Sequence, residues 1–268
     1  QSTLLTLTPS SSGDSKYNSS SLAQSLTTVT TDNDTVGLVL SKTTATLSES
    51  GTTDNFSVVL TSEPTATVTL TLSDNDSTEV SATPSTLSFG SGNWSVAQWV
   101  TLTGKDDNVS DDNQTTLLTL TPSGGDYSGL AAPTLTVTTS DNDTVGLVLS
   151  KSSALVSENG SVSDNFSVVL RSAPTANVTL TLSDNDSTEV TASPTSLSFS
   201  SGNWSVAQWV TLTGKDDNAS DDNQTVLLTL TPSSGDGKYN SSSLAQTLTV
   251  TTIDDADTVG LVLSKSSG

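Results

Sequence analysis

The feature that most constrains the fold of this chain is a letter-for-letter internal repeat. The stretch SGNWSVAQWVTLTGKDDN occupies residues 91–108 and returns unchanged at residues 201–218, 110 positions later. A copy of this length cannot arise by chance, so the chain is a tandem array of one structural unit. Each unit must complete its own core within about 110 residues, which is the size of a small β-sandwich domain.

The recurring letters TVGLVLS mark where each repeat begins. We predict two complete repeats, at residues 35–143 and 144–257, because both open with this stretch. Residues 1–34 match the end of a repeat and are predicted to be the C-terminal part of a preceding one. Residues 258–268 contain only the opening letters and are predicted to be the first strand of a following repeat. We therefore expect a window on a longer array, and pairing of the two ends between chains is the alternative.

Within each repeat the apolar and polar residues alternate, which is the period of a β-strand. Short β-branched runs such as FSVVL at 56–60 and VTLTL at 68–72 are separated by clusters of Asp, Asn, Gly, Ser and Pro. About seven such strands in about 110 residues predict an all-β chain of tandem, immunoglobulin-like antiparallel sandwiches. The four phenylalanines are expected in the cores: Phe56, Phe89, Phe166 and Phe199.

Composition removes several classes of function. The chain has no Cys, Met or His, which excludes disulfides, thiol and imidazole chemistry, and the common zinc sites. Its net charge of −21 argues against nucleic acid and anionic membranes as partners, and no run is apolar enough for membrane insertion. Paired carboxylates exist, but no apolar pocket that would raise the pKa of one of them is evident. We expect no enzymatic activity.

The order of these segments resembles a known family. DNDTVGLVLS, then SExG, TDNFSVVLTSEPTATVTLTLS, TLSFGSGNW and WVTLTGKDDN follow one another as in the Calx-beta-like repeats of large prokaryotic extracellular surface and adhesin proteins. The resemblance covers both complete repeats and the partial ends. It implies a β-sandwich fold, calcium at the acidic loops, and service as an extracellular spacer or adhesive array. It does not indicate a particular ligand.

Acidic residues are concentrated in alternate loops. If successive strands run in opposite directions, the loops after the first, third and fifth strands lie at the same pole as the end of the seventh. In the first complete repeat this pole receives eleven acids, whereas the opposite pole receives only Glu63 and Asp126. The acids of the crowded pole are Glu49, Asp54, Asp74, Asp76, Glu79, Asp106, Asp107, Asp111, Asp112, Asp141 and Asp143. The second repeat copies them as Glu158, Asp164, Asp184, Asp186, Glu189, Asp216, Asp217, Asp221, Asp222, Asp254, Asp255 and Asp257.

Crowded carboxylates repel one another, and a hard dication relieves that repulsion. Ca²⁺ takes six to eight oxygen ligands from flexible loops, so these acids are candidate calcium ligands. The spacing of an EF-hand loop is absent, so the site would be composite, with ligands from several loops. The alternative is a solvated acidic loop end in a halophilic or merely soluble protein. Because no linker separates the repeats, calcium at this pole would stiffen the joint to the next repeat.

Every one of the 16 asparagines is followed two positions later by Ser or Thr, with no Pro between them. This pattern favours N-glycosylation on an outer surface, although Asn also serves as a turn residue in a Ser/Thr-rich chain. Asn93 and Asn203 are the first candidates because they lie away from the acidic pole. The further candidates are Asn18, Asn177 and Asn240.

The repeated stretch contains two tryptophans of opposite parity. In a regular strand, Trp94, Val96, Val100 and Leu102 share the core face, so Trp99 points outward. An outward Trp, repeated as Trp209, suggests contact with another chain or a sugar. The alternative is a bulge that turns the ring inward, or a rim position that a loop covers.

These observations predict a structural repeat of an extracellular filament or giant cell-surface protein, rigidified by calcium at the acidic poles. The expected partners are copies of the chain, or further repeats of it, in a filament, with glycans as further candidates. The rival hypothesis is an adhesin module that binds a carbohydrate or a receptor through the exposed tryptophans.

Overall fold

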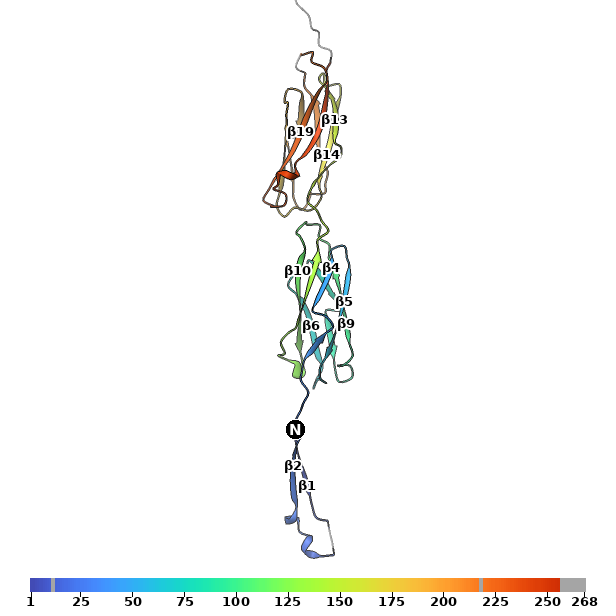
Figure 1. The fold of residues 1–268 in the computed structure, drawn as a ribbon, viewed down its shortest axis with the longest axis vertical. Coiled ribbons are helices and arrows are strands. Elements are labelled where there is room, and N and C mark those ends of the chain that lie inside the picture. The colour runs from blue at the N-terminus through green and yellow to red at the C-terminus, as the bar shows by residue number, and fades with distance from the viewer. Residues whose placement is uncertain (11–12, 217–218, 256–268) are drawn as a thin grey trace, which may run out of the picture.

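Figure 1 shows the computed structural model, which describes residues 1–10, 13–216 and 219–255. The described chain is all-β: two sandwiches follow one another along the long axis, and a two-stranded hairpin extends beyond the first. The only helical elements of this part are single 3-10 turns, namely η1 (Ser15–Tyr17), η2 (Ser20–Leu22), η3 (Gly125–Tyr127) and η4 (Ser242–Leu244). None of the described helices is long and apolar enough to cross a membrane.

The first sandwich packs a four-stranded sheet against a five-stranded sheet. All neighbouring strands are antiparallel except β4 and β11, which are parallel. The four-stranded sheet has the order β3 (Leu38–Leu40), β5 (Thr53–Leu60), β9 (Gln98–Gly104) and β7 (Val80–Thr83). The five-stranded sheet has the order β4 (Thr44–Ser48), β11 (Thr134–Ser140), β10 (Gln114–Ser123), β6 (Val68–Asp74) and β8 (Thr86–Phe89).

The second sandwich repeats this topology strand for strand. Its four-stranded sheet has the order β12 (Leu147–Leu149), β14 (Ser163–Leu170), β18 (Gln208–Gly214) and β16 (Val190–Ser193). Its five-stranded sheet has the order β13 (Ser153–Ser157), β20 (Gln246–Ile253), β19 (Gln224–Ser234), β15 (Val178–Asp184) and β17 (Ser196–Phe199). The predicted strand within residues 258–268 lies outside the described residues.

The count of about seven strands is too low, because two predicted strands each divide between the sheets. The first becomes β3 and β4: Ser41 N still donates to Ser57 O in one sheet, whereas Thr136 N donates to Thr43 O in the other. The fourth becomes β7 and β8, with Pro84 between them. Pro84 has no N–H to donate to a ladder, and the chain passes from one sheet to the other at this residue. Each sandwich therefore has nine short strands.

The core of each sandwich lies between its two sheets. Phe56, Phe89, Phe166 and Phe199 are fully buried, which confirms their expected core positions. Val100 and Leu102 of β9 are likewise buried, but the predicted parity fails before this strand. Residues 91–96 form a turn and β9 begins only at Gln98, so Val96 is 59% exposed instead of facing the core. Trp94 packs at the edge of the core, half-buried.

A buried tyrosine closes the end of each sandwich opposite to the acidic loops. The Tyr127 hydroxyl accepts a hydrogen bond from Ser62 N at 3.1 Å and donates one to Ser62 O at 2.9 Å. Tyr239 does the same with Ser172, at 3.1 and 2.8 Å. The hydroxyl thus satisfies two backbone groups of a loop that would otherwise be buried without partners.

Tyr127→Phe should destabilise the first sandwich by about 1–3 kcal/mol, because Ser62 N and O would stay buried without a partner. Urea unfolding at equilibrium measures this loss. Tyr17→Phe is the matched control, since Tyr17 occupies the equivalent position of the N-terminal hairpin but is 62% exposed. Equal stability of the Tyr127→Phe variant and the parent chain would contradict the assigned role.

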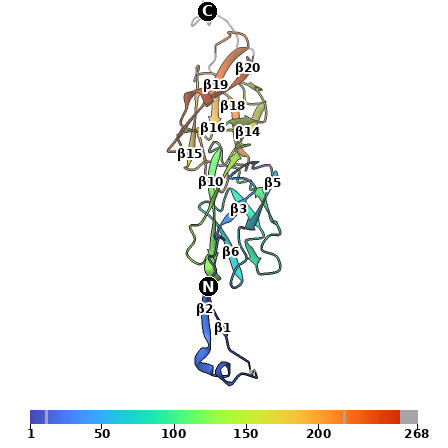
Figure 2. The same cartoon turned by 60° about the horizontal axis from the view of Figure 1, so that its bottom comes forward.

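The N-terminal hairpin consists of β1 (Ser2–Leu7) and β2 (Gln24–Val29), paired antiparallel with Leu5 opposite Leu26. Figures 1 and 2 show it standing apart from both sandwiches, with its strand ends near the first sandwich and its turn pointing away. All residues of β1 and β2 are exposed.

Candidate metal site at the acidic end of each sandwich

Four segments meet at the end of the first sandwich that faces the second, and we call this region the acidic end. They are residues 49–52 after β4, 75–79 after β6, 105–113 after β9, and 141–143 after β11. Glycine allows two of them to approach closely: a Cβ on Gly104 would lie 2.2 Å from Ser48 O. The second sandwich has the same arrangement at Gly214 and Ser157 O.

One group of carboxylates at the acidic end comprises Glu49, Asp141 and Asp143, whose oxygens lie within 4.8 Å of one another. Glu49 is buried, and one of its carboxylate oxygens accepts a hydrogen bond from Asn142 N at 3.3 Å. Burial raises the pKa of Glu49, and the neighbouring charges of Asp141 and Asp107 raise it further. Burial also raises the pKa of Asp143, again reinforced by adjacent aspartates.

A second group comprises Glu79, Asp107 and Asp111, again with carboxylate oxygens within 4.8 Å. Glu79 is only 2% exposed. Burial raises the pKa of Glu79 to about 7, and the charges of Asp111, Glu49 and Asp107 add to this shift. The expectation that no carboxylate of this pole would have a raised pKa is therefore wrong, because the loops themselves bury the side chain.

The two groups contain carboxylate oxygens that are buried but accept no hydrogen bond from the described residues. They are Glu79 Oε2, Asp111 Oδ1 and Asp143 Oδ2. Burying a charged oxygen without a partner is unfavourable, so native proteins pair such atoms or use them to coordinate a metal ion. The set consists of hard oxygen donors on loops, which fits Ca²⁺ better than softer metals.

The second sandwich carries the equivalent group Glu158, Asp254 and Asp255, also within 4.8 Å. Glu158 and Glu189 are buried, and Asp254 Oδ1 is buried without a hydrogen bond from the described chain. Asp216, Asp221 and Asp222 are exposed. The candidates Asp217 and Asp257 lie outside the described residues.

Two predicted ligands are paired with lysine instead of joining the groups. Asp54 Oδ1 lies 2.6 Å from Lys42 Nζ, and Asp164 Oδ1 lies 2.6 Å from Lys151 Nζ. The hydrogen bond from Lys42 lowers the pKa of Asp54. For Asp164 burial opposes the shift, but hydrogen bonds from Lys151 and from backbone amides outweigh it and lower the pKa. The signal was present in the sequence, since both repeats place a lysine directly after LVLS.

Other predicted ligands lie beside the groups but outside them. The side chains of Asp76 and Asp186 accept hydrogen bonds from the backbone and hydroxyl of Thr78 and Thr188, which fixes the turn after β6 and β15. Asp74 and Asp184 end those strands and are half-buried. Asp106 accepts a hydrogen bond from Asn142 Nδ2 at 3.3 Å.

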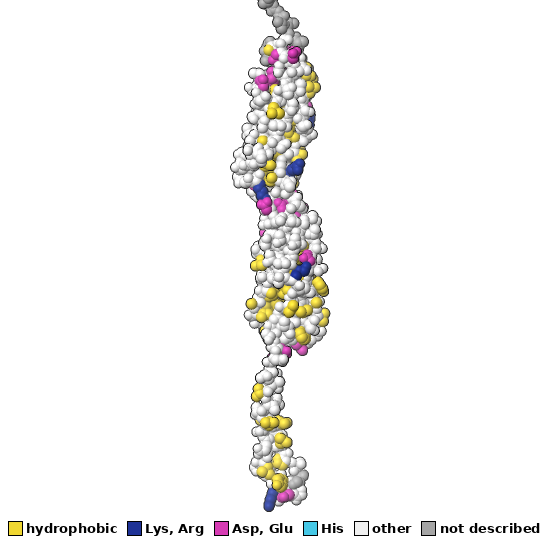
Figure 3. Space-filling model, viewed as in Figure 1, with side chains coloured by type: hydrophobic (Ala, Val, Ile, Leu, Met, Phe, Trp, Pro, Cys, Tyr) yellow, Lys and Arg dark blue, Asp and Glu magenta, His cyan; other side chains and the backbone are white. Residues whose placement is uncertain are grey.

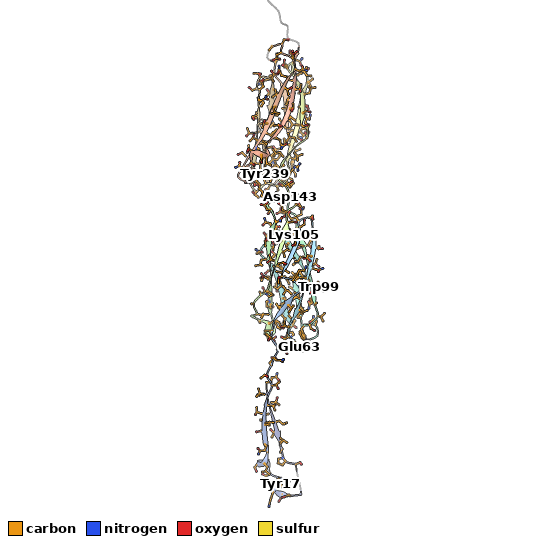
Figure 4. The ribbon with its side chains drawn as sticks, viewed as in Figure 1. Tyr17, Glu63, Trp99, Lys105, Asp143 and Tyr239 are labelled. Carbon is orange, nitrogen blue, oxygen red and sulfur yellow. The ribbon has the colours of Figure 1, made fainter. Side chains whose placement is uncertain are left out.

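The acidic end also contacts the second sandwich directly. Lys238 Nζ lies 3.0 Å from Asp112 Oδ1, and Ala173 N donates a hydrogen bond to Asn108 O at 2.7 Å. Figure 3 shows acidic and basic side chains meeting at this junction, and Figure 4 places Asp143 there. Lys238 is a joint residue that the sequence reasoning missed, because it lies more than 120 residues from its partner.

Trp99 and Trp209 point outward, as parity predicted, and each is 58% exposed. Trp99 lies on the outer face of the four-stranded sheet, opposite Ser57 of β5, and Figure 4 shows it at the flank of the first sandwich. Trp209 occupies the same place opposite Ser167. The bulge and the covering loop are therefore absent at both positions. Contact with a partner stays a prediction.

The first-choice sequon residues hold turns in both sandwiches. Asn93 Oδ1 accepts a hydrogen bond from Gly90 N, and its Nδ2 donates to Ser88 O. Asn203 binds Ser200 and Ser198 in the same way. Asn18, Asn177 and Asn240 are exposed. Glycosylation of any of the five stays a prediction, and the turn role that the structure displays accounts for Asn93 and Asn203.

No family model and no curated protein matches the sequence. Among solved structures, CBD12 from CALX1.2 is 16% identical, with a TM-score of 0.33, and the match covers 73% of this chain and 80% of that one. The apo form of the Calx CBD1 domain is 21% identical, with a TM-score of 0.32, and 42% and 98% are covered. Domains 4 and 5 of the S-layer protein SbsC are 13% identical, with a TM-score of 0.30, and 51% and 65% are covered. These scores are low, so the fold assignment rests on the sheets described above.

Proposed function

We propose that this chain is a spacer of tandem Calx-beta-like sandwiches from an extracellular filament or cell-surface protein, stiffened by calcium at its acidic ends. The observation that carries the proposal is the position of the two carboxylate groups. They lie where the first sandwich meets the second, and they include buried oxygens that no described residue satisfies. A solvated acidic loop end would expose its carboxylates, whereas Glu49 and Glu79 are at most 2% exposed.

Calcium would supply positive charge that offsets the mutual repulsion of these acids and holds their loops in one arrangement. Glu49, Asp141 and Asp143 would hold one ion, and Glu79, Asp107 and Asp111 another. The loop of residues 105–113 matters most for stiffness, because it carries ligands of the second group and also contacts the next sandwich through Asn108 and Asp112. Fixing this loop would fix the angle between the sandwiches.

Spin labels on the two sandwiches test this proposal directly. The chain has no cysteine, so Thr101→Cys with Thr211→Cys places one label on each sandwich at equivalent exposed positions. We expect a narrow distribution of label distances in calcium and a clearly broader one in chelator. Thr101→Cys with Thr121→Cys is the control within one sandwich, and its distribution should not change. An inter-sandwich distribution of the same width in both conditions would refute a stiffening role.

A second function, carbohydrate or receptor binding, is favoured by the two exposed tryptophans. Exposed aromatic rings at fixed spacing are common anchors of sugars and protein partners. We expect the Trp99→Ser/Trp209→Ser double variant to lose at least tenfold in affinity for any ligand found in a glycan-binding screen. Its thermal stability should change little because both rings are more than half exposed. If the screen finds no ligand, or if the double variant binds as well as the parent chain, binding through the tryptophans is rejected and the spacer role is the only proposed function that remains.

A further inference from the structure

We propose that Asn55 and Asn165 are N-glycosylation sites whose attached sugars cover the exposed rings of Trp99 and Trp209. This inference does not rest on calcium. It also differs from the binding of a free carbohydrate, because the chain itself carries the sugar that covers each tryptophan. The sites lie on the outer face of the four-stranded sheet of each sandwich.

An asparagine, a hydroxyl and an aromatic ring are neighbours on this face of the first sandwich. Ser57 lies opposite Trp99 in the pairing of β5 with β9, and Asn55 lies two residues before Ser57. Phe56, between them, is fully buried, so Asn55 and Ser57 both point away from the core. Trp99 is therefore directly across from Ser57 and diagonal to Asn55. Side chains in a diagonal pair are about 7–8 Å apart, which is within reach of an aromatic ring.

The second sandwich repeats the arrangement in β14 and β18. Ser167 lies opposite Trp209, and Asn165 lies two residues before Ser167. Phe166, between them, is fully buried, so both residues again point outward. Each sandwich therefore places an acceptor asparagine and an aromatic ring together on one exposed sheet face.

The side-chain amides of Asn55 and Asn165 are accessible. Both residues are exposed, and each donates its backbone N–H to the carboxylate of the preceding aspartate. No hydrogen bond of the described chain involves either side-chain amide. Asparagine is disfavoured in strands and usually serves in turns. Each of these two is the third residue of an eight-residue strand, so the turn role that accounts for Asn93 and Asn203 does not apply to them.

Several other sequon asparagines use their side chains to hold the backbone. Asn75 Oδ1 accepts a hydrogen bond from Leu117 N at 2.5 Å. Asn185 Oδ1 accepts the equivalent bond from Leu227 N at 2.6 Å. A sugar on these amides would have to fit beside a bond that joins two segments of the sandwich. The structure therefore favours the two strand asparagines over these loop positions.

The face around each tryptophan is uncharged, although the chain has a net charge of −21. Val39 and Trp99 are 51% and 58% exposed, and Val59 lies opposite Val39 on the same face. A pyranose ring has an apolar C–H face that can pack on an indole and hydroxyl groups that stay in water. It would therefore remove the apolar surface from water without needing a charged partner. The outward residues of the two central strands are Thr53, Asn55, Ser57, Val59, Trp99, Thr101 and Thr103.

The attachment is a glycosyl transfer from a saccharide that is linked to a lipid diphosphate. Asn55 Nδ2 forms a bond to the anomeric carbon of the saccharide. The bond between that carbon and the diphosphate oxygen breaks, and the lipid diphosphate leaves with the electron pair. One amide proton passes to a base of the transferase, and nothing is oxidised or reduced. The chain supplies only the acceptor sequence, in which Ser57 provides the hydroxyl and Phe56 the middle position.

Glycopeptide mass spectrometry tests the attachment on protein purified from the cells that produce it naturally. We expect Asn55 and Asn165 to carry a saccharide in most molecules and Asn75 to carry none. The Ser57→Ala/Ser167→Ala variant, produced in the same cells, should lose both sugars while keeping both asparagines. Unmodified Asn55 and Asn165 in the natural protein would overturn the proposal.

Oxidation by hydroxyl radicals, read residue by residue, tests whether the sugars cover the rings. Trp99 and Trp209 should oxidise at least threefold more slowly in the glycosylated protein than in the Ser57→Ala/Ser167→Ala variant. Tyr17, which is 62% exposed on the hairpin, should react equally in both. Equal oxidation of the tryptophans in the two proteins would overturn the covering role. Protection that persists in the variant and disappears on dilution would also overturn it, since a second copy of the chain would then cover the rings.

Discussion

Calcium should raise the unfolding temperature of the chelated chain by roughly 10–20 °C once the free ion exceeds its dissociation constant about a hundredfold. A single ion at that excess stabilises the folded state by about 2.7 kcal/mol, provided that it does not bind the unfolded chain. About 1 kcal/mol corresponds to roughly 4–8 °C for a domain of this size. Differential scanning calorimetry with chelator and then with added calcium measures the shift.

Three comparisons separate coordination from simple screening of charge. Potassium chloride at equal ionic strength screens repulsion between exposed acids but does not coordinate buried oxygens, so it should stabilise the chain much less than calcium. Glu49→Gln with Glu79→Gln should remove most of the calcium effect on the first sandwich, because each residue belongs to one of its two carboxylate groups. Asp54→Asn should retain it, since Asp54 pairs with Lys42 outside the groups. Equal stabilisation by potassium and calcium would favour the solvated loop end.

The all-β class and the residues of the core could be predicted because both depend on local alternation. Phe56 and Phe166 face inward wherever a period-two strand packs one face against a second sheet. Alternation also indicates which loops share an end, provided that each strand reverses the chain. Glu49, Glu79 and Asp107 are consequently close in space although they come from three different loops.

What could not be predicted depends on contacts between residues far apart. A period of two residues tells which face of a strand a side chain lies on, but it does not tell to which sheet the strand belongs. The division of one predicted strand into β7 and β8 at Pro84 was therefore not predicted. The number of acids at each pole does not show which of them pair with a lysine. Asp54 forms an ion pair with Lys42 and so does not join the acidic groups, and Asp112 pairs with Lys238 of the next sandwich. At Val96 the parity argument failed because the residue lies in a turn, where side-chain direction follows local backbone geometry.

The second large effect that we predict concerns pH. In chelator, the free energy of unfolding should fall as the pH rises from 5 to 8. The pKa of Glu79 is about 7 in the folded chain against an ordinary value of 4.5, so the folded state holds the proton more tightly. Stability from that proton is fully present below the ordinary value and is lost as the pH rises through about 7. For an isolated group, this difference in pKa corresponds to roughly 3 kcal/mol in the free energy of unfolding.

The raised pKa values of Glu49, Asp111 and Asp143 act in the same direction. Saturating calcium should reverse the trend, because the ion requires the deprotonated carboxylates and competes with protons for them. Glu79→Gln should flatten the profile in chelator and make the variant more stable than the parent chain at pH 8. Urea unfolding from pH 5 to 8, with and without calcium, distinguishes these cases. Stability in chelator that increases with pH over this range would show that these carboxylates are not held in a desolvated group. The proposed calcium site would then lose its physical basis.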